Sequence, residues 1–287
     1  MSAIFKKANT AVITGGASGI GLALAQKCIG HGMRVLVADW DAANLDTAAQ
    51  SLGTAATTLR MDVSKTEDWS QLQSKVASDF GGQINLLALN AGIGTRTAFE
   101  GAEADPAGFR KVLDVNFFGV VNGISTFLPG IKEKAASASA AGDYEAAIVI
   151  TGSKQGITNP PGNPAYNASK AAVKALAEQL SFDLRAQKNV NVHLLVPGWT
   201  WTALAGAASG REKPEAAWTP AQVVDYLEGK MGEKQFWVLC PDNDVTEEMD
   251  KKRMLWSGGD AVKGRPPLSR WRDEYKDEFA AWMAKDL

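Results

Sequence analysis

Short apolar runs recur along the first two hundred residues of the chain. Each has four to eight residues, is rich in Val, Ile and Leu, and does not alternate with polar positions. The runs are Thr10–Thr14, Arg34–Ala38, Thr57–Met61, Ile84–Asn90, Ala146–Thr151 and Val190–Val196, with a seventh at Gln235–Cys240. Continuous apolar runs of this length are typical of strands buried on both faces of a parallel sheet. The pattern therefore predicts seven such strands.

Segments of helical length separate these runs. The clearest are Gly19–His31, Lys65–Phe80, Pro106–Ile131 and Tyr166–Gln187. Repeated strand–helix units imply right-handed crossovers, which place helices on both faces of the sheet. We therefore expect an α/β fold with a doubly wound, mostly parallel, seven-stranded sheet, formed by residues 1–241 as one domain.

Two stretches depart from this regular pattern. Lys132–Glu145 is rich in small residues, so we expect a flexible lengthening of a helix–strand connection. Because it precedes a strand, it should lie at the edge of the sheet opposite any site at the carboxyl ends. Residues 242–287 follow the last strand, and we expect a C-terminal helical extension packed on the same domain or on a neighbouring subunit.

Charge and composition narrow the classes of partner. The 287 residues include 30 Lys and Arg against 32 Asp and Glu, a net charge of −2, without basic blocks. Nucleic acid is not expected as a partner, because phosphate backbones are bound by clustered cations. No membrane partner is expected either, since no apolar run approaches roughly 18–20 residues and no signal core is present. Two cysteines, Cys28 and Cys240, suit a reducing, cytoplasmic compartment.

A glycine-rich turn, Thr14–Gly21 (TGGASGIG), joins the first predicted strand to the first predicted helix. Glycine lets the backbone turn tightly and approach a ligand closely. A helix N-terminus also offers unpaired N–H groups to a pyrophosphate. The spacing is G-x-x-x-G-x-G, which differs from the commoner G-x-G-x-x-G. Its place between a strand and a helix indicates a dinucleotide-binding turn.

Asp39 ends the second predicted strand, twenty residues after Gly19. A carboxylate at this place accepts hydrogen bonds from the hydroxyls of an adenosine ribose and repels a 2′-phosphate. No Lys or Arg lies in the turn or directly after Asp39 to bind such a phosphate. NAD is therefore favoured over NADP, although Asp39 could instead only begin the following loop.

Tyr166 and Lys170 lie four residues apart in a predicted helix and so share one of its faces. Tyrosine has an unperturbed pKa of about 10. A nearby ammonium group, or an oxidised nicotinamide, would lower the pKa of Tyr166 by stabilising the phenolate. Ser153, at the carboxyl end of the fifth predicted strand, could donate a hydrogen bond to a substrate oxygen. A lone Tyr–Lys pair is a common surface pattern, but the ordered set indicates a catalytic site.

These motifs resemble those of the short-chain dehydrogenase/reductase family over roughly residues 8–241. The matching positions are Thr14–Gly21, Asp62-Val63, Asn90-Ala91-Gly92, Asn116, Ser153, Tyr166 with Lys170, and Pro197-Gly198 with Thr202. The resemblance implies a Rossmann-like fold and catalysis by Asn116, Ser153, Tyr166 and Lys170. It also implies cofactor contacts from Gly15, Ser18, Gly19, Ile20, Gly21, Asp39, Asp62, Val63, Asn90, Ala91, Gly92, Tyr166, Lys170, Pro197, Gly198, Thr200 and Thr202.

The resemblance assigns roles to several of these positions. Asp62 and Val63 would hold the adenine, Asn90 would steady the turn, and Thr202 would contact the nicotinamide amide. Lys170 would bind the nicotinamide ribose. The resemblance thus implies an enzyme that interconverts a secondary alcohol and a ketone with NAD. Because the family commonly forms dimers and tetramers, a homodimer or homotetramer is expected.

The implied mechanism is acid–base catalysis coupled to hydride transfer. Tyr166 would take the hydroxyl proton of a small-molecule alcohol while a hydride passes to C4 of the nicotinamide, and Asn116 would hold a water in the proton relay. The steps reverse for reduction. Alternatives are an NADPH-dependent carbonyl reductase, a catalytically silent nucleotide-sensing or scaffold protein, and a sugar-nucleotide epimerase or dehydratase. The last is expected to have a longer substrate domain.

Other chemistry-bearing residues give weaker indications. His31 and His193 have no carboxylate or cysteine at ligand spacing, so no metal site is expected. Cys28 and Cys240 are expected to be packed residues. Lys154 and Gln155 follow Ser153 directly; they could bind a polar or anionic substrate group, or Lys154 could be solvated.

Tryptophans concentrate in the final third, where seven of the nine lie from Trp199 onward. The resemblance places a mobile substrate lid at about residues 199–220, where Trp199 and Trp201 could stack on a substrate. They could equally pack beneath the lid or at a subunit interface. Further on, Trp271, Tyr275, Phe279 and Trp282 recur at helical spacing and predict one apolar stripe that docks on the body or on a neighbour.

Overall fold

A seven-stranded sheet forms the centre of the chain in the computed structural model, which describes residues 3–138, 144–207 and 211–286. All pairings are parallel, and the strand order is β3-β2-β1-β4-β5-β6-β7. The strands are β1 Thr10–Thr14, β2 Arg34–Asp39, β3 Ala56–Arg60, β4 Leu86–Leu89, β5 Ala146–Thr151, β6 Val190–Val196 and β7 Trp237–Leu239. The predicted fold class is confirmed. The order reverses between β1 and β4, and ligands bind beyond the carboxyl ends of strands at such a point.

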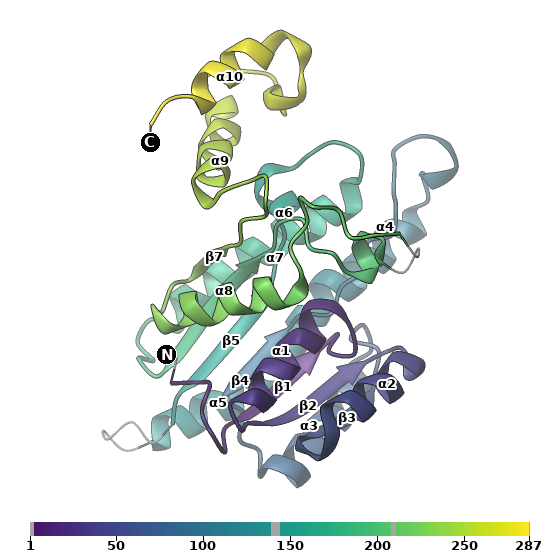
Figure 1. The fold of residues 1–287 in the computed structure, drawn as a ribbon, viewed down its shortest axis with the longest axis vertical. Helices are drawn as coiled ribbons and strands as arrows, with labels where there is room; N and C mark the ends of the chain where they lie inside the picture. Colours follow the sequence, from purple (N-terminus) through teal and green to yellow (C-terminus); the bar gives the residue numbers. More distant parts are fainter. Residues whose placement is uncertain (1–2, 139–143, 208–210, 287) are drawn as a thin grey trace.

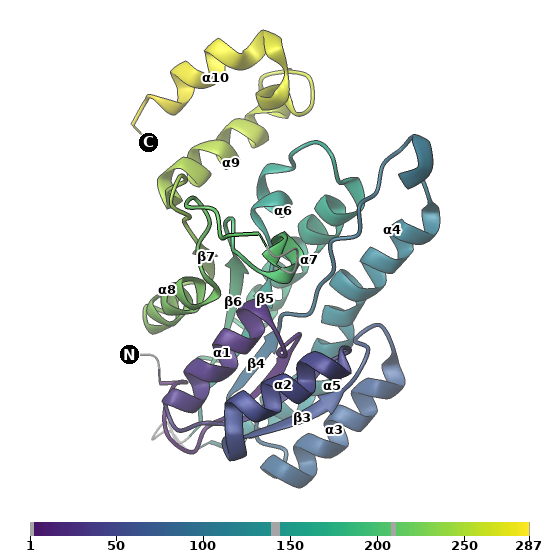
Figure 2. The same cartoon turned by 45° about the vertical axis from the view of Figure 1, so that its right-hand side comes forward.

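Helices cover both faces of the sheet (Figures 1 and 2). One layer packs through the apolar faces of α3 Thr66–Phe80, α5 Gly119–Ser137 and α7 Pro164–Asp183. The other packs through α1 Gly19–Gly30, α2 Ala42–Leu52 and α8 Pro220–Gly232. Because strand side chains alternate between faces, neighbouring strand residues join different cores. Ile148 and Ile150 face the first layer, whereas Ala147 and Val149 face the second.

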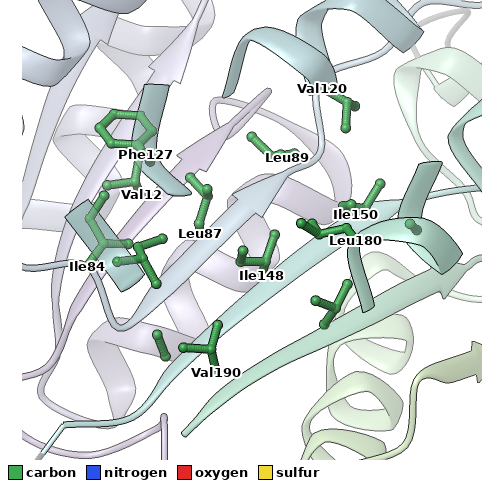
Figure 3. Close-up of a cluster of buried hydrophobic side chains, with 14 of the residues drawn as sticks. Val12, Ile84, Leu87, Leu89, Val120, Phe127, Ile148, Ile150, Leu180 and Val190 are labelled. Carbon is green, nitrogen blue, oxygen red and sulfur yellow. The ribbon is translucent and has the colours of Figure 1, made fainter. Parts of the chain in front are cut away.

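The first core is a continuous apolar layer (Figure 3). Strand residues such as Leu87 and Ile148 pack against helix residues such as Phe127 and Leu180, and each is at most 6% exposed. Removing roughly 25 cal/mol per Å² of apolar surface from water holds the helices onto the sheet. This packing fixes the carboxyl ends of the strands relative to one another.

The long helical segment after β4 differs from its prediction. Pro106–Ile131 was expected to be one helix, but α4 Pro106–Leu113 and α5 are joined by a π-helical turn at Asp114–Phe118. Lys132–Glu145 was expected to be a flexible connection, which is wrong for its first part because α5 continues to Ser137. Residues 139–143 of that prediction lie outside the described residues.

The same segment, Pro106–Ser137, is long and apolar enough to cross a membrane by length and composition alone. Its residues Val120, Phe127 and Ile131 are buried in the first core. A core helix passes the same test, and the packing of α5 against the sheet accounts for the buried part of this stretch.

Residues 242–286, here called the C-terminal extension, lie beyond α6 Lys154–Thr158 (Figures 1 and 2). The extension contains α9 Glu247–Val262, two 3₁₀ turns at Ser269–Trp271 and Asp273–Tyr275, and α10 Lys276–Met283. The single stripe predicted over residues 271–282 is therefore wrong. Phe279 and Trp282 pack on Trp256 of α9, with ring centroids 5.2 and 6.2 Å apart, whereas Trp271 is 41% exposed.

Candidate active site

The glycine-rich turn lies at the carboxyl end of β1, beside the loop after β4. Gly15 and Gly19 have φ angles of +62° and +53°, a region that side chains disfavour. A Cβ on Gly21 would lie 2.1 Å from the carbonyl oxygen of Gly15, and one on Gly15 would lie 2.8 Å from Cα of Ala91. The backbone can thus fold tightly here and leave the N-terminus of α1 open. Ser18 is the N-cap of α1 and Ile20 lies in its first turn, against the second core.

Asn90, Ala91 and Thr14 tie this turn to the neighbouring strands. Asn90 Nδ2 donates to the carbonyl oxygens of Thr14 and Gly15 at 3.3 and 3.2 Å. The backbone N–H groups of Asn90 and Ala91 donate to Thr14 Oγ1 at 3.1 and 3.2 Å. Asn90 Oδ1 accepts from Thr151 Oγ1 at 3.1 Å. Asn90 therefore links β1, β4 and β5, in keeping with the steadying role that the resemblance implies.

Asp39 ends β2 with its carboxylate against the turn. Its Oδ2 accepts from the Ala17 N–H at 3.1 Å and its Oδ1 from the Asp41 N–H at 3.2 Å. These bonds hold an acidic group beside the N-terminus of α1, where an adenosine ribose lies in dinucleotide-binding folds. The open helix N-terminus, the close-packed glycines and this carboxylate together fit a bound nicotinamide dinucleotide.

Asp62 and Val63 follow β3 and are held by their own loop. Asp62 Oδ1 accepts from the N–H and the hydroxyl of Ser64 at 3.0 and 2.7 Å. Val63 is buried, and its carbonyl oxygen accepts from Trp69 Nε1 at 2.8 Å. These bonds hold the loop in place, and the adenine contact of these two residues stays a prediction.

Ser153, Tyr166 and Lys170 come together at the carboxyl end of β5. Lys170 is buried on α7; its Nζ donates to the carbonyl oxygen of Thr151 at 2.8 Å and lies 5.8 Å from the ring centroid of Tyr166. The side chain of Ser153 lies close enough to Tyr166 to oppose the rise in its pKa. The hydroxyl of Ser153 also caps α6 by accepting from the Gln155 N–H at 3.2 Å.

The electrostatics of this group differ from the sequence-based expectation. Burial raises the pKa of Tyr166, and the interaction with Ser153 only partly opposes that change. Burial also lowers the pKa of Lys170 to about 8. The expected lowering of the Tyr166 pKa is therefore wrong for the protein without a cofactor, because desolvation outweighs the stabilisation of the phenolate.

Asn116 lies in the π-helical turn between α4 and α5 and is fully buried. Its side chain donates to the carbonyl oxygen of Ile93 and to Ser169 Oγ, both at 3.0 Å, and accepts from the Ile93 N–H at 2.8 Å. A Cβ on Gly92 would lie 3.3 Å from Asn116 Oδ1 and 3.5 Å from Lys170 Nζ. Asn116 and Lys170 thus meet beside Gly92, as a proton relay between them would require.

The predicted lid begins after β6 with Pro197-Gly198. Thr200 is buried, and its hydroxyl donates to the carbonyl oxygen of Gly198 at 3.1 Å. Thr202 lies at the glycine turn, with its Cγ2 3.1 Å from the position of a Cβ on Gly19. This base of the lid therefore meets the place where the cofactor pyrophosphate is expected. Residues 208–210 of the lid lie outside the described residues.

The tryptophans of the lid divide into two kinds. Trp199 is 46% exposed and Trp201 is half-buried, so both are accessible to a ligand. Trp218 instead packs on Tyr226 of α8, with ring centroids 5.9 Å apart, and its N–H donates to the carbonyl oxygen of Trp199. Trp218 thus joins the lid to α8, whereas the substrate contacts of Trp199 and Trp201 stay predictions.

Lys154 is neither solvated nor free to bind a substrate anion. Its Nζ forms ion pairs with Asp242 Oδ2 at 3.1 Å and Asp250 Oδ2 at 2.9 Å. Both partners belong to the C-terminal extension and were missed, because no local spacing links them to the catalytic serine. Gln155 donates its backbone N–H to Ser153 Oγ, and a substrate contact of its side chain stays a prediction.

The two cysteines are buried and unpaired with each other. Burial raises the pKa of the Cys28 thiol, and raises that of Cys240 to about 12. The reactive form of cysteine is the thiolate, so neither residue is a nucleophile at neutral pH. The prediction that they are packed residues is confirmed.

Known proteins share these features. The family model for short chain dehydrogenases matches residues 9–213. The NADP-dependent (R)-specific alcohol dehydrogenase of Lentilactobacillus kefiri is 30% identical over 210 residues, which cover 72% of this chain and 79% of that protein. The galactitol 2-dehydrogenase (L-tagatose-forming) of Cereibacter sphaeroides is 32% identical over 207 residues, 71% of this chain and 76% of that protein.

Structural similarity extends further along the chain. A crystal structure of a short-chain dehydrogenase/reductase from Burkholderia phymatum in complex with NAD covers 92% of this chain and 97% of its own, with a TM-score of 0.78 and 27% identity. The sequence matches, the sheet order and the site geometry agree with one another. The chain belongs to the short-chain dehydrogenase/reductase family and is an oxidoreductase of that family.

Proposed function

We propose that this protein is an NAD-dependent oxidoreductase that interconverts a secondary alcohol and a ketone, with Tyr166 as the general acid/base. The observation that carries the proposal is the convergence of Ser153, Tyr166 and Lys170 at the end of β5, beside the glycine turn. Relatives that act on alcohols, such as the dehydrogenases of L. kefiri and C. sphaeroides, support the same reaction class.

The residues of the site divide the work of alcohol oxidation. Bound NAD⁺ supplies the acceptor for the hydride that leaves the carbinol carbon. The Tyr166 oxygen takes the hydroxyl proton, and the Ser153 hydroxyl orients the substrate oxygen. Lys170 and a water held by Asn116 would pass the proton outward, and positioned transfers of this kind contribute about 10²–10⁴-fold to rate.

The buried tyrosine needs a positive charge to ionise near neutral pH. In the protein alone, burial raises the pKa of Tyr166 and lowers that of Lys170 to about 8. Burial therefore disfavours both the phenolate and the ammonium. An oxidised nicotinamide is cationic and favours the phenolate. Tyr166 is therefore expected to become an effective base only in the complex with NAD⁺.

The carboxylate of Asp39 supports NAD over NADP. Its position beside the Ala17 N–H leaves a negative charge where the 2′-phosphate of NADP would lie. NADPH remains the alternative cofactor because the relative from L. kefiri is NADP-dependent. Equilibrium titration with NADH and NADPH separates the two, and tighter NADPH binding would replace this proposal by an NADPH-dependent carbonyl reductase.

A substrate panel tests the reaction itself. Secondary alcohols, polyols and aromatic alcohols are incubated with NAD⁺, and the matching ketones with NADH, while NADH absorbance is followed. Turnover with at least one pair is expected. If NADH binds but no compound on a broad panel is converted with either cofactor, the protein is instead a silent nucleotide-sensing protein.

We also propose a homodimer or homotetramer in the cytoplasm. Only 33% of the most apolar stretch of Pro106–Ser137 is buried within one chain, which leaves apolar helix surface for a second copy. The free cysteines fit a reducing compartment. Sedimentation velocity and cell fractionation test these two points, and a monomer or a secreted protein would contradict them.

A further inference from the structure

The first residue of α6, Lys154, connects the catalytic serine to the C-terminal extension. Lys154 follows Ser153 directly, and its Nζ lies between Asp242 after β7 and Asp250 on α9, at 3.1 and 2.9 Å. The side chains of Lys154, Asp242 and Asp250 are only 15%, 7% and 1% exposed. These are buried ion pairs, so solvent screens them little.

The same carboxylate also holds the base of the lid. Asp242 Oδ2 accepts from the Trp199 N–H at 3.1 Å. A Cβ on Gly198 would lie 2.7 Å from that oxygen and 2.8 Å from Lys154 Nζ, so the backbone at Gly198 packs directly on the ion pair. The N–H of Lys154 also donates to the carbonyl oxygen of Pro197 at 3.4 Å. The loop of Ser153, the base of the lid and the extension therefore share one charged contact.

Asp250 anchors this contact to α9. Its Oδ1 pairs with Arg253 at 3.3 Å while its Oδ2 pairs with Lys154. Lys154, Arg253, Asp242 and Asp250 thus form a buried charged cluster, and Arg270 also interacts electrostatically with Asp250. Removal of one partner from such a cluster leaves an uncompensated buried charge, which displaces its neighbours or draws in water.

We propose that Asp250 is a positioning residue for catalysis: by holding Lys154, α9 fixes the Ser153 loop and the Gly198–Trp199 base of the lid. The C-terminal extension is then part of the active-site framework of this chain. This inference rests on the proposed function for its kinetic part alone. Small displacements of positioned groups cost up to about 10²-fold in rate, so the effect should appear in kcat.

The test compares two buried aspartates of α9 in the full-length protein. Asp250→Asn removes the charge that holds Lys154. Asp260→Asn is the matched control, because Asp260 is also buried and ion-paired on the same helix, but its partners are Arg265 and Ser269 within the extension. We expect kcat to fall about tenfold in Asp250→Asn, with the Kd for NADH changed less than about twofold, whereas Asp260→Asn keeps the wild-type kcat.

Hydrogen exchange separates this inference from the proposed reaction. Peptides spanning residues 153–158 and 198–202 should exchange faster in Asp250→Asn than in the wild type, and at the wild-type rate in Asp260→Asn. This result needs no turnover, so it stands even if the alcohol panel fails. The inference is wrong if the wild type is active and both variants have its kcat and its exchange rates. It is also wrong if kcat falls, and exchange rises, equally in Asp250→Asn and Asp260→Asn.

A second variant guards against misfolding of Asp250→Asn. The double variant Lys154→Gln/Asp250→Asn removes one cation and one carboxylate, so the net charge of the cluster is unchanged while Asp242 and Arg253 remain. If the two residues act through each other, its loss of kcat should be clearly smaller than the product of the two single losses. Independent, multiplicative losses would overturn the coupling.

Discussion

The ammonium nitrogen of Lys170 lies 2.8 Å from the carbonyl oxygen of Thr151, the last residue of β5. This bond fixes the catalytic lysine to the strand that leads to Ser153. It also keeps a cation in a fully buried place, and burial lowers the pKa of Lys170 from 10.5 to about 8. The protein therefore retains, below about pH 8, a charge that its interior disfavours.

Lys170→Met should stabilise the protein while it abolishes turnover. Lowering the pKa of Lys170 by about 2.5 units means that the buried charge destabilises the folded protein by roughly 3 kcal/mol. The variant also loses the bond to Thr151, which stabilises by about 1 kcal/mol, so its net gain should be about 2 kcal/mol. Between pH 8 and 10.5, Lys170 is protonated in the unfolded chain but largely neutral in the folded protein. The free energy of unfolding of the wild type therefore rises with pH over that range. The advantage of the variant should be full below pH 8 and become a deficit of about 1 kcal/mol above pH 10.5, where only the lost bond to Thr151 counts, as measured by urea unfolding.

Lys174→Met provides the control for this prediction. Lys174 lies one turn further along α7, pairs with Glu178 at 3.0 Å and is 30% exposed. Exposed pairs of this kind contribute about 0–1 kcal/mol, so its stability should change little and without the same pH dependence. A Lys170→Met variant less stable than the wild type at pH 7 would contradict the assigned cost of the buried cation.

Tyr166→Phe should lose catalysis and keep cofactor binding. The ring and its packing remain, but the oxygen that exchanges a proton with the substrate is gone, so kcat should fall by about 10²–10⁴-fold. The Kd for NADH, from fluorescence titration, should stay within about twofold of the wild type. Full activity of the variant on the true substrate would show that another group transfers the proton.

Tyr144→Phe should give the opposite pattern. Tyr144 is buried near the amino end of β5, and its hydroxyl donates to the carbonyl oxygen of Ile84 at 2.5 Å. The lost bond leaves a buried acceptor unpaired and should cost about 1–3 kcal/mol of unfolding free energy. Its kcat should be that of the wild type, which separates a structural tyrosine from the catalytic one.

Much of the fold follows from local pattern. β5 and β6 occupy Ala146–Thr151 and Val190–Val196, as predicted, because strands buried on both faces have continuous apolar sequences. The order of the motifs also predicts the places of Ser153 and Tyr166, at the end of β5 and in the first turn of α7, whereas no pattern indicated the π-helical turn that holds Asn116. Periodicity failed at residues 269–275, where 3₁₀ turns replace the expected helix after Leu268 takes a φ of +58°.

The environment of Lys154 could not be predicted from the sequence. Its partner Asp242 lies 88 residues further along the chain, and Asp250 follows on another helix. Pairing between distant segments is set by the packing of α6 against α9, not by any spacing within one segment. The raised pKa of Tyr166 could not be predicted from the sequence either, because it results from burial in the folded site.

Asp39→Ser should weaken the preference for NAD. The variant loses the negative charge that repels a 2′-phosphate, so the ratio of the NADPH and NADH dissociation constants should fall at least about tenfold, or 1.4 kcal/mol. Asp41→Ser is the control: Asp41 caps α2 by accepting from the Asn44 N–H, and serine is also a good cap. An unchanged ratio in Asp39→Ser would remove the physical basis for assigning NAD.

Two glycines of α1 should respond to alanine in opposite ways. A Cβ on Gly21 would lie 2.1 Å from the carbonyl oxygen of Gly15, so Gly21→Ala must displace the turn. A Cβ on Gly30, at the end of the same helix, meets nothing within 4 Å. Gly30→Ala should therefore stabilise the protein by up to about 1 kcal/mol, because alanine restricts the unfolded chain and favours the helix.

Cofactor affinity distinguishes these two variants. Gly21→Ala should weaken NADH binding by at least about tenfold, because the displaced turn no longer presents the N-terminus of α1 to the pyrophosphate. Gly30→Ala should bind NADH as the wild type does. Isothermal titration calorimetry measures both, and thermal unfolding without cofactor reports the stability. Wild-type affinity in Gly21→Ala would mean that the pyrophosphate lies elsewhere, since the clash makes the present turn incompatible with alanine.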